Sequence, residues 1–564
     1  MIPSLVDVLV IGGGATGAGI LRDLSRRGLR CLLVDKSDMG TGTSGRYHGL
    51  LHSGGRYVSK DPIAARECID ENRVLRRIAP HCIEDTGGLF VATRDDPADY
   101  VEAFPEASAA CGVPCEEVPL DELFRREPAL DRSIWRAYRV PDASLEPWQL
   151  IEANLADARA HGSQAVPYQR VVGMTRNGAQ ITSVELHDER SGSLSRVAAR
   201  MVVSAAGAWA GRVAALAGVE LAMSPGKGTM LVYNQRMTDT VVNRCHRPGD
   251  GDIMVPVHLV AILGTTEIRV DDPDRYGISR EEVMALIAEG SKLFPDLPRM
   301  RLLRAYAGVR PLYQLEPPAD PGDVRGISRA HVVIDHEQRD GVRNLVSIVG
   351  GKLTTYRLMA EQTADAVAAK LGVSVRCTTA EDALPGADDR HYYWLGHRLA
   401  EHEHQGGGDA ELICECEIVT RDGLERFLDE HWPCSLDDVR RGTRLGMGPC
   451  QGGFCTFRAV GAMARRGTRD GDAPGRGADD RSPPESGAAD DAAEEATLAA
   501  FVEERYKGIR PIVWGRQLQE LWLTTGIYAG VLGVGAPRSA PQALVSGVNA
   551  SRVEPTPGGR DGQG

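Results

Sequence analysis

The sequence has few of the features that mark membrane, secreted or nucleic-acid-binding proteins. No uninterrupted apolar run in its 564 residues approaches the ~20 residues of a membrane-spanning helix. Residues 1–7 contain no basic side chain and include Asp7, so we expect no signal peptide. The net charge of −13 argues against nucleic acid as a partner, because neutralising phosphates requires a basic face.

Lysine is also scarce, since only seven of the 65 basic residues are Lys and the others are Arg. Apolar residues make up 42% and charged residues 25%, which is ordinary for a globular chain. The 12 cysteines are many for a chain without a secretory signal. In a reducing compartment we expect them to be metal ligands, catalytic thiols or core residues rather than disulfides.

One segment has almost nothing to place in a core. Residues 467–497 contain no Val, Ile, Leu, Met, Phe, Tyr or Trp, and hold nine acids against three arginines. Such a segment cannot bury enough apolar surface to offset its ordering entropy, so it is predicted to be a disordered acidic linker. The chain then continues with a C-terminal segment over residues 498–540. We expect its aromatic stretch at 512–532 either to dock a partner or, as the preferred alternative, to pack on its own domain.

A glycine-rich turn near the N-terminus lies between an apolar run and an amphipathic stretch. Residues 6–11 predict a strand buried on both faces, and a second apolar run ends at Asp35. Gly12 would allow a tight turn, Gly14 would let the backbone approach a pyrophosphate, and Gly17 would let helix and strand pack closely. Asp35 lies 23 residues beyond Gly12, where its carboxylate would accept hydrogen bonds from a ribose. The pattern predicts a dinucleotide site with a helix N-terminus facing the phosphates.

Nucleotide-binding signals recur in three separated segments, at about 1–60, 200–215 and 345–371, with strands and turns between them. FAD lies extended along its domain and suits this spacing, as well as the loop that contains Ser44. A self-contained NAD domain would instead place its second half directly after the first. We therefore predict an α/β fold for residues 1–376, with a Rossmann-like FAD-binding domain and an inserted β-rich substrate domain.

Two cysteine pairs occupy a predicted module at 413–465. Cys414-x-Cys416 and Cys450-x4-Cys455 are separated by 33 residues, and glycines around the second pair let backbone amides turn toward sulfur atoms. The pattern resembles the small ferredoxin-associated domain, which binds a 2Fe–2S cluster through four thiolates. Zinc held by four thiolates is the alternative. We predict a C-terminal iron–sulfur domain.

Several long, ungapped stretches carry a resemblance to a known family. The chain resembles the FAD-dependent glycerol-3-phosphate dehydrogenases, in particular the A subunits of the anaerobic type. The matching stretches are IGGGATGAGI, GRYHGLLHSGGRY, ARECIDEN, IAPHC, AYAGVRPL, GGKLTTYRLMAE and RLGMGPCQGGFC. The resemblance implies oxidation of sn-glycerol 3-phosphate to dihydroxyacetone phosphate by hydride transfer to FAD.

The resemblance also implies partners and a place in the cell. Flavin accepts two electrons as a hydride, whereas a 2Fe–2S cluster carries one at a time. Electrons would therefore leave singly, through the B and iron–sulfur C subunits of the complex, to the quinone pool. We expect a cytoplasmic chain that is peripheral on the inner face of the cell membrane through these partners.

A site for this reaction needs local positive charge, because the chain is acidic and the substrate is a dianion. The substrate-binding candidates lie in segments that match the family: Arg56 with Tyr57, Arg310 and Lys352. Arginine can fork onto phosphate or the ketone oxygen, and lysine can act as a point charge. Lys352 is a lysine in a chain that otherwise favours arginine, which points to a role that Arg would not serve.

The proton acceptor is left open by the sequence. His52 is the preferred candidate and His48 is an alternative, because both lie near the predicted flavin and histidine is the usual base at neutral pH. His258, in the middle domain, is a less supported alternative.

Three further glycines belong to the expected FAD site. Gly207 resembles the family segment that returns to the pyrophosphate. Gly350 and Gly351 precede a helix whose N-terminus would stabilise negative charge on reduced flavin.

Two other functions share parts of this pattern. A flavin oxidase of the amine or amino-acid type has the same fold and early motifs. A non-catalytic electron-transfer subunit would keep the cofactors, although the Arg56, Arg310 and Lys352 segments argue against it.

Overall fold

The apolar run near the N-terminus forms the central strand of a parallel sheet. The computed structural model describes residues 2–313, 330–388, 390–404, 411–471, 488–531 and 534. In it, β1 (Leu5–Ile11) pairs in parallel with β2 (Cys31–Val34) on one side and β12 (Leu194–Ser204) on the other. The sheet continues to β9 (Gln164–Val166) beyond β2 and to β20 (Leu345–Gly350) beyond β12. This order confirms the prediction of a nucleotide-binding sheet assembled from separated segments.

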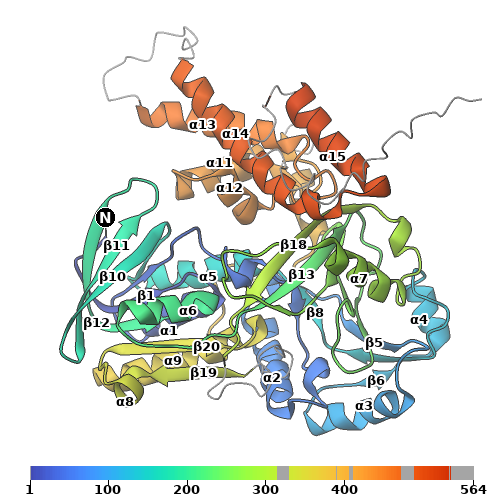
Figure 1. Cartoon of the computed structure of the whole chain (residues 1–564), viewed down its shortest axis with the longest axis horizontal. Helices are drawn as coiled ribbons and strands as arrows, with labels where there is room; N and C mark the ends of the chain where they lie inside the picture. The colour runs from blue at the N-terminus through green and yellow to red at the C-terminus, as the bar shows by residue number, and fades with distance from the viewer. Residues whose placement is uncertain are drawn as a thin grey trace, which may run out of the picture.

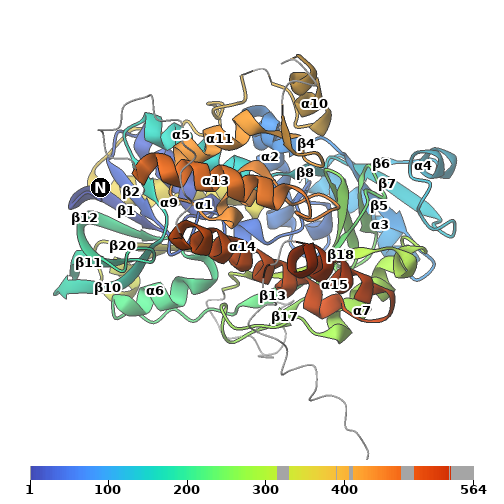
Figure 2. The same cartoon turned by 90° about the horizontal axis from the view of Figure 1, so that it is seen from above.

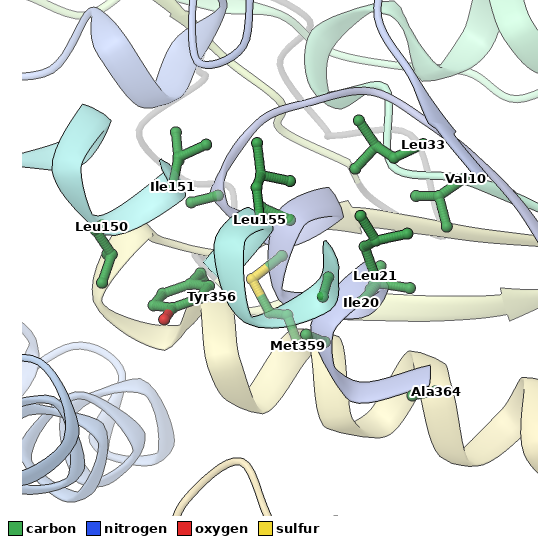
Figure 3. Close-up of a cluster of buried hydrophobic side chains, with 14 of the residues drawn as sticks. Val10, Ile20, Leu21, Leu33, Leu150, Ile151, Leu155, Tyr356, Met359 and Ala364 are labelled. Carbon is green, nitrogen blue, oxygen red and sulfur yellow. The ribbon is translucent and has the colours of Figure 1, made fainter. Parts of the chain in front are cut away.

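Three helices cover one face of this sheet. The helix α1 (Ala15–Arg26) contacts both α5 (Pro147–Ala160) and α9 (Tyr356–Leu371). Figure 3 shows Ile20 and Leu21 of α1 among apolar side chains from the other two helices, and both are completely buried. Close packing of α1 fixes the position of the glycine turn that precedes it.

The sheet takes in more of the chain than the three predicted segments. The strands β10 (Gln169–Asn177) and β11 (Gln180–Asp188) pair antiparallel beside β12, and β19 (His331–Asp335) pairs antiparallel with β20. Their alternating polar and apolar residues did not distinguish them from strands of the inserted domain.

A second, nine-stranded sheet forms most of the predicted substrate domain. It is built from β5 (Gly88–Ala92), β6 (Glu116–Glu117), β7 (Arg136–Val140), β13 (Gly226–Tyr233), β14 (Val241–Arg244), β15 (Ile253–Val257), β16 (Val260–Gly264), β17 (Ile268–Arg269) and β18 (Leu302–Arg310). β18 pairs antiparallel with β13 over the whole of that strand, which brings Arg310 opposite Gly226. The helix α7 (Arg280–Ser291) begins with a capping box between Ser279 and Glu282.

The C-terminal part is a helical module that lies above both sheets in Figure 1 and crosses them in Figure 2. Its elements are β21 (Leu412–Cys414), β22 (Val419–Thr420), α11 (Arg421–His431), α12 (Leu436–Thr443), α13 (Cys455–Gly471), α14 (Ala488–Ile509) and α15 (Leu518–Thr525). Leu424, Val439, Phe501 and Tyr528 belong to one buried cluster. Tyr528 of the aromatic stretch therefore packs on the cysteine module, whereas Trp522 and Val531 of the same stretch are exposed.

The predicted linker is shorter than expected. The helix α13 continues to Gly471 and α14 begins at Ala488, so both ends of the 467–497 segment are helical. Alanine and glutamate are strong helix formers, and α14 gains an apolar face from Leu498 onward that pins it to the module. Residues 472–487 lie outside the described residues. Within the part of the chain that the structure describes, no helix combines the length and apolar character that crossing a membrane requires.

Candidate functional site

One cavity of about 1600 Å³ lies between the two sheets and the C-terminal module. Most of the residues expected to bind cofactor or substrate line it, although they come from segments up to 340 positions apart in the sequence. They are Gly12, Gly14, Asp35, Ser44, His48, His52, Arg56, Tyr57, Gly207, Arg310, Gly350, Gly351 and Lys352. Gly17 and the four cysteines of the two pairs are not among the lining residues.

The glycine turn is shaped by close backbone contacts. Gly12 has a φ of +113°, and a Cβ there would lie 2.5 Å from the carbonyl oxygen of Ala205. A Cβ on Gly17 would lie 1.9 Å from the carbonyl oxygen of Gly12. Side chains are therefore excluded at both positions, and Gly17 acts by letting α1 approach the turn.

The start of α1 is open toward the cavity. Gly14 caps the helix without a side-chain hydrogen bond, and a backbone N–H of the first turn, that of Ala15, donates to Ser44 Oγ at 3.0 Å. Unpaired N–H groups at a helix start favour an anion such as a pyrophosphate. The turn and the cavity of about 1600 Å³ beside it fit FAD.

Asp35 is held at the end of β2 by two backbone donors. Gly13 N–H donates to Oδ2 at 2.7 Å and Ser37 N–H to Oδ1 at 2.9 Å. Each oxygen keeps a further lone pair with which it can accept a ribose hydroxyl. Burial raises the pKa of Asp35, and the two backbone hydrogen bonds oppose that shift.

Arg310, which lines the same cavity, is fixed by the second sheet. A Cβ on Gly228 of β13 would lie 2.6 Å from Arg310 Nη2, so the missing side chain makes room for the guanidinium. Nη2 donates to Thr265 Oγ1 and to the carbonyl oxygen of Thr266, and Nη1 lies 3.8 Å from a Glu267 oxygen. The group is thus presented to the cavity in one orientation.

The two other cations have partners of different kinds. Arg56 Nη2 lies 3.0 Å from Oδ1 and 3.1 Å from Oδ2 of the buried Asp252, so its charge is balanced within the protein. Lys352 Nζ lies 5.1 Å from the centre of the Tyr57 ring, which is a cation–π contact.

The histidines differ in what their rings can do. His48 Nδ1 accepts the backbone N–H of Leu50 at 3.2 Å, which places the proton of the neutral ring on Nε2 and makes that atom a donor. Burial and the charges of Arg56 and Arg310 lower the pKa of His48 to about 3. Burial, together with His48, Arg56 and Lys352, holds the pKa of His52 well below its ordinary value. Both rings are therefore neutral at pH 7. Nδ1 of His48 already accepts the backbone N–H of Leu50, so it is not free to accept a substrate proton.

His258 lies outside the cavity. Its Nδ1 is 2.8 Å from a Glu417 oxygen, and its ring stacks on Tyr393 at 4.5 Å. Arg444 joins the same buried group by binding Glu417 at 3.0 Å and also Glu146, which precedes α5. Although burial opposes it, the charges of Arg444 and His258 lower the pKa of Glu417 to about 2. His258 thus connects the second sheet to the module and is not positioned to act as the base.

The four cysteines meet in the module as two pairs. The Sγ atoms of Cys416 and Cys450 are 3.8 Å apart, and Cys414 makes a side-chain hydrogen bond with Cys455. Cys416 and the backbone N–H groups of residues 452–454 lower the pKa of Cys450 to about 6. Among the described residues, no three His, Cys, Asp or Glu side chains surround a single metal position.

Some residues that shape the site carried no signal in the sequence. Asp252 and Thr265 are far along the sequence from Arg56 and Arg310, whose side chains they hold. Neither belongs to a recognisable motif. Thr354 accepts the backbone N–H of His52 at 3.1 Å. It lies within the GGKLTTYRLMAE stretch, so that motif was the one available pointer.

Comparisons with known proteins agree with this geometry. The FAD dependent oxidoreductase family matches residues 7–366. The chain is 39% identical to the A subunit of the anaerobic glycerol-3-phosphate dehydrogenase of Escherichia coli (strain K12), over 94% of this chain and 97% of that protein. It is 41% identical to the A1 subunit of the Haloferax volcanii enzyme, over 93% and 90%. The solved glycerol-3-phosphate dehydrogenase of Bacillus halodurans, complexed with FAD, shares the fold with a TM-score of 0.62 at 20% identity, over 91% of this chain and 97% of that one.

The contact between Gly17 and Gly12 gives a test of the nucleotide site. Gly17→Ala should weaken FAD binding by at least about tenfold, because the new Cβ pushes α1 away from the turn. Titration of the apoprotein with FAD measures this change. Gly526→Ala, where a Cβ meets open space, is the matched control and should bind FAD normally. Normal FAD affinity in Gly17→Ala would contradict the assignment.

Proposed function

This chain belongs to the anaerobic glycerol-3-phosphate dehydrogenase A subunits within the FAD dependent oxidoreductases, and from that premise we propose how its cavity performs the reaction. The chain oxidises sn-glycerol 3-phosphate to dihydroxyacetone phosphate with FAD. The observation that carries the mechanism is that Arg310, Lys352 and the neutral His52 line the same cavity as the glycine turn. FAD held along that cavity by the glycine turn and Asp35 would supply the acceptor for the hydride from carbon 2 of the substrate.

The three cations contribute to phosphate binding in different ways. Arg310 donates a fork of N–H groups to phosphate oxygens, since Thr265 and Thr266 hold its guanidinium in one orientation. Lys352 supplies a point charge beside Tyr57. Arg56 is already balanced by Asp252, so it contributes a fixed donor more than net charge.

His52 accepts the proton of the C2 hydroxyl. Arg56 and Lys352 help to keep its pKa low, and the substrate phosphate counters both charges. Binding of the substrate therefore raises the proton affinity of His52 at the moment when a base is needed. His48, with its proton on Nε2, donates a hydrogen bond to a substrate oxygen instead.

The cysteine centre provides the exit for electrons. Cys414, Cys416, Cys450 and Cys455 would hold a 2Fe–2S cluster, because they form two close thiol pairs in loops with backbone N–H donors. A single tetrahedral zinc would need all four sulfur atoms around one position. A cluster of this kind hands electrons on one at a time, which favours a dehydrogenase over the flavin oxidase considered above.

The partners follow from the same reading. The relatives are named as subunits, which supports a complex of several chains. We infer that the B and iron–sulfur C subunits of such a complex take electrons from the cysteine module and pass them to membrane quinone. Contact with the membrane would then be made through these partners.

Substitution of Arg310 tests the substrate site. Arg310→Ala should lower kcat/KM for sn-glycerol 3-phosphate by about 10²-fold or more, because a forked, charged contact with the phosphate is lost. Anaerobic stopped-flow reduction of the flavin measures this, and the variant should keep its FAD. Arg275→Ala, with a side chain that is 89% exposed, is the control and should be unaffected. Unchanged reduction in Arg310→Ala would refute its role.

The choice of base can be tested with the two histidines. His52→Gln should slow flavin reduction by about 10²–10⁴-fold with little change in substrate affinity, whereas His48→Gln should cost less. In the wild type kcat/KM falls as pH drops through the pKa of His52, and that limb should lie below pH 6.5. A larger loss in His48→Gln, or an acid limb above pH 6.5, would reverse the assignment.

Metal analysis tests the cysteine centre. Anaerobically purified protein should contain iron and acid-labile sulfide in equal amounts, and Cys450→Ser should lose both. Cys434→Ser is the control, because Cys434 lies outside the two pairs and should keep the cluster. Zinc without sulfide would establish the alternative centre and remove the proposed electron exit.

A further inference from the structure

Three arginine side chains come from elements that contact one another beside the cavity and the cysteine loops. Arg304 comes from β18, Arg440 from α12 and Arg505 from α14. Arg304 and Arg440 line the cavity. Arg505 is only 3% exposed and donates from Nη1 to Oε1 of Gln451, the residue that follows Cys450.

The three positive charges lie close enough to disfavour one another. Burial and the charge of Arg440 lower the pKa of Arg304 to about 10. Burial and the charges of Arg304 and Arg440 lower the pKa of Arg505 to about 9. Collecting like charges away from water costs free energy unless anions compensate them.

The protein supplies too few carboxylates to compensate the cluster. Arg440 pairs with Asp437 at 3.0 Å, and the nearby Glu504 binds Lys507. Among the described residues, no carboxylate lies within ion-pair distance of Arg304 or Arg505. The Nε atom of Arg304 is buried without a hydrogen-bond partner. Asp437 and Glu504 act on Arg304, and Glu520 acts on Arg505, only from beyond ion-pair distance, so neither arginine has a direct ion pair among the described residues.

The position of Arg304 is fixed by its neighbours. Gly508 of α14 leaves room for it, since a Cβ there would lie 3.0 Å from Arg304 Cβ and 3.2 Å from Nε. The guanidinium lies 5.7 Å from the ring centre of Tyr306, whose hydroxyl donates to the Tyr47 carbonyl oxygen at 2.7 Å. Arg304 therefore lies at the contact between the second sheet and the C-terminal module.

We propose that Arg304 and Arg440, with Arg505 behind them, bind the dianion of inorganic phosphate or of a phosphate monoester. Two charges without a direct ion pair match a dianion, and guanidinium groups fork onto its oxygens. The site opens onto the same cavity as Arg310 but is made from other residues. The ester arm rests on the proposed function, in which substrate and product are both phosphate monoesters.

Calorimetry with a holoenzyme that lacks the substrate contact tests the site. Arg310→Ala holoenzyme titrated with inorganic phosphate should bind it at one site. Adding Arg304→Gln should weaken that binding by at least about tenfold. Adding Arg299→Gln, with a side chain that is 82% exposed, is the control and should change nothing. No binding to Arg310→Ala, or binding indifferent to Arg304→Gln, would overturn the proposal.

A second titration separates the sources of the phosphate. If sn-glycerol 3-phosphate also binds to Arg310→Ala and needs Arg304, the site accepts esters. If only inorganic phosphate binds there, the site is one for the free ion. Reduction of the wild-type flavin by sn-glycerol 3-phosphate is measured separately, so a failure of the proposed function does not resemble a failure of this site.

Chemical labelling keeps the proposal testable if the variants do not fold. Phenylglyoxal modifies accessible arginines of the wild-type holoenzyme, and peptide mapping locates the modified residues. Inorganic phosphate should protect Arg304 and Arg440 from labelling and leave Arg299 labelled. Equal labelling of Arg304 and Arg440 with and without phosphate would overturn the proposal.

Discussion

Positive charge held inside one cavity of an acidic chain is the constraint on which the site depends. Removing a cation from water costs free energy, and a different kind of contact stabilises each cation here. Asp252 balances Arg56, two threonines and a nearby glutamate hold Arg310, and the Tyr57 ring faces Lys352. Burial, together with the field of these cations, holds the pKa of both histidines below the ordinary value, so both are neutral at pH 7. In the proposed reaction the same charges bind the phosphate dianion. Binding and proton transfer thereby become parts of one electrostatic arrangement.

The same constraint connects the three parts of the molecule. Glu417 of the cysteine module, His258 of the second sheet and Arg444 form one buried group, and Arg444 also reaches Glu146 beside the first sheet. Such a group is stable only when all its members are present, because removing one leaves an unpaired buried charge. It therefore ties the cysteine loops to the flavin-binding half. Electron transfer between two centres requires that kind of fixed spacing.

The local parts of this arrangement could be predicted from sequence. The turn at Gly12 and the acid at Asp35 follow from short-range geometry, and the structure places both as the motif requires. The pairing of Arg56 with Asp252 could not be predicted, since the two are 196 positions apart and no pattern links them. The predicted linker reached too far at both ends. Composition shows that a segment has no apolar residues for a core, but it does not show that the segment can extend a helix whose apolar residues lie next to it. His258 was considered as a base because a sequence does not show which histidines face a cavity.

We propose that electrons pass from the substrate through the flavin to the cysteine centre. Rapid-freeze electron paramagnetic resonance, after anaerobic mixing of the holoenzyme with sn-glycerol 3-phosphate, tests this route. A reduced iron–sulfur signal should grow within the time of a single turnover, as the oxidised flavin absorbance falls. A flavin that is fully reduced while no iron–sulfur signal develops would contradict the claim.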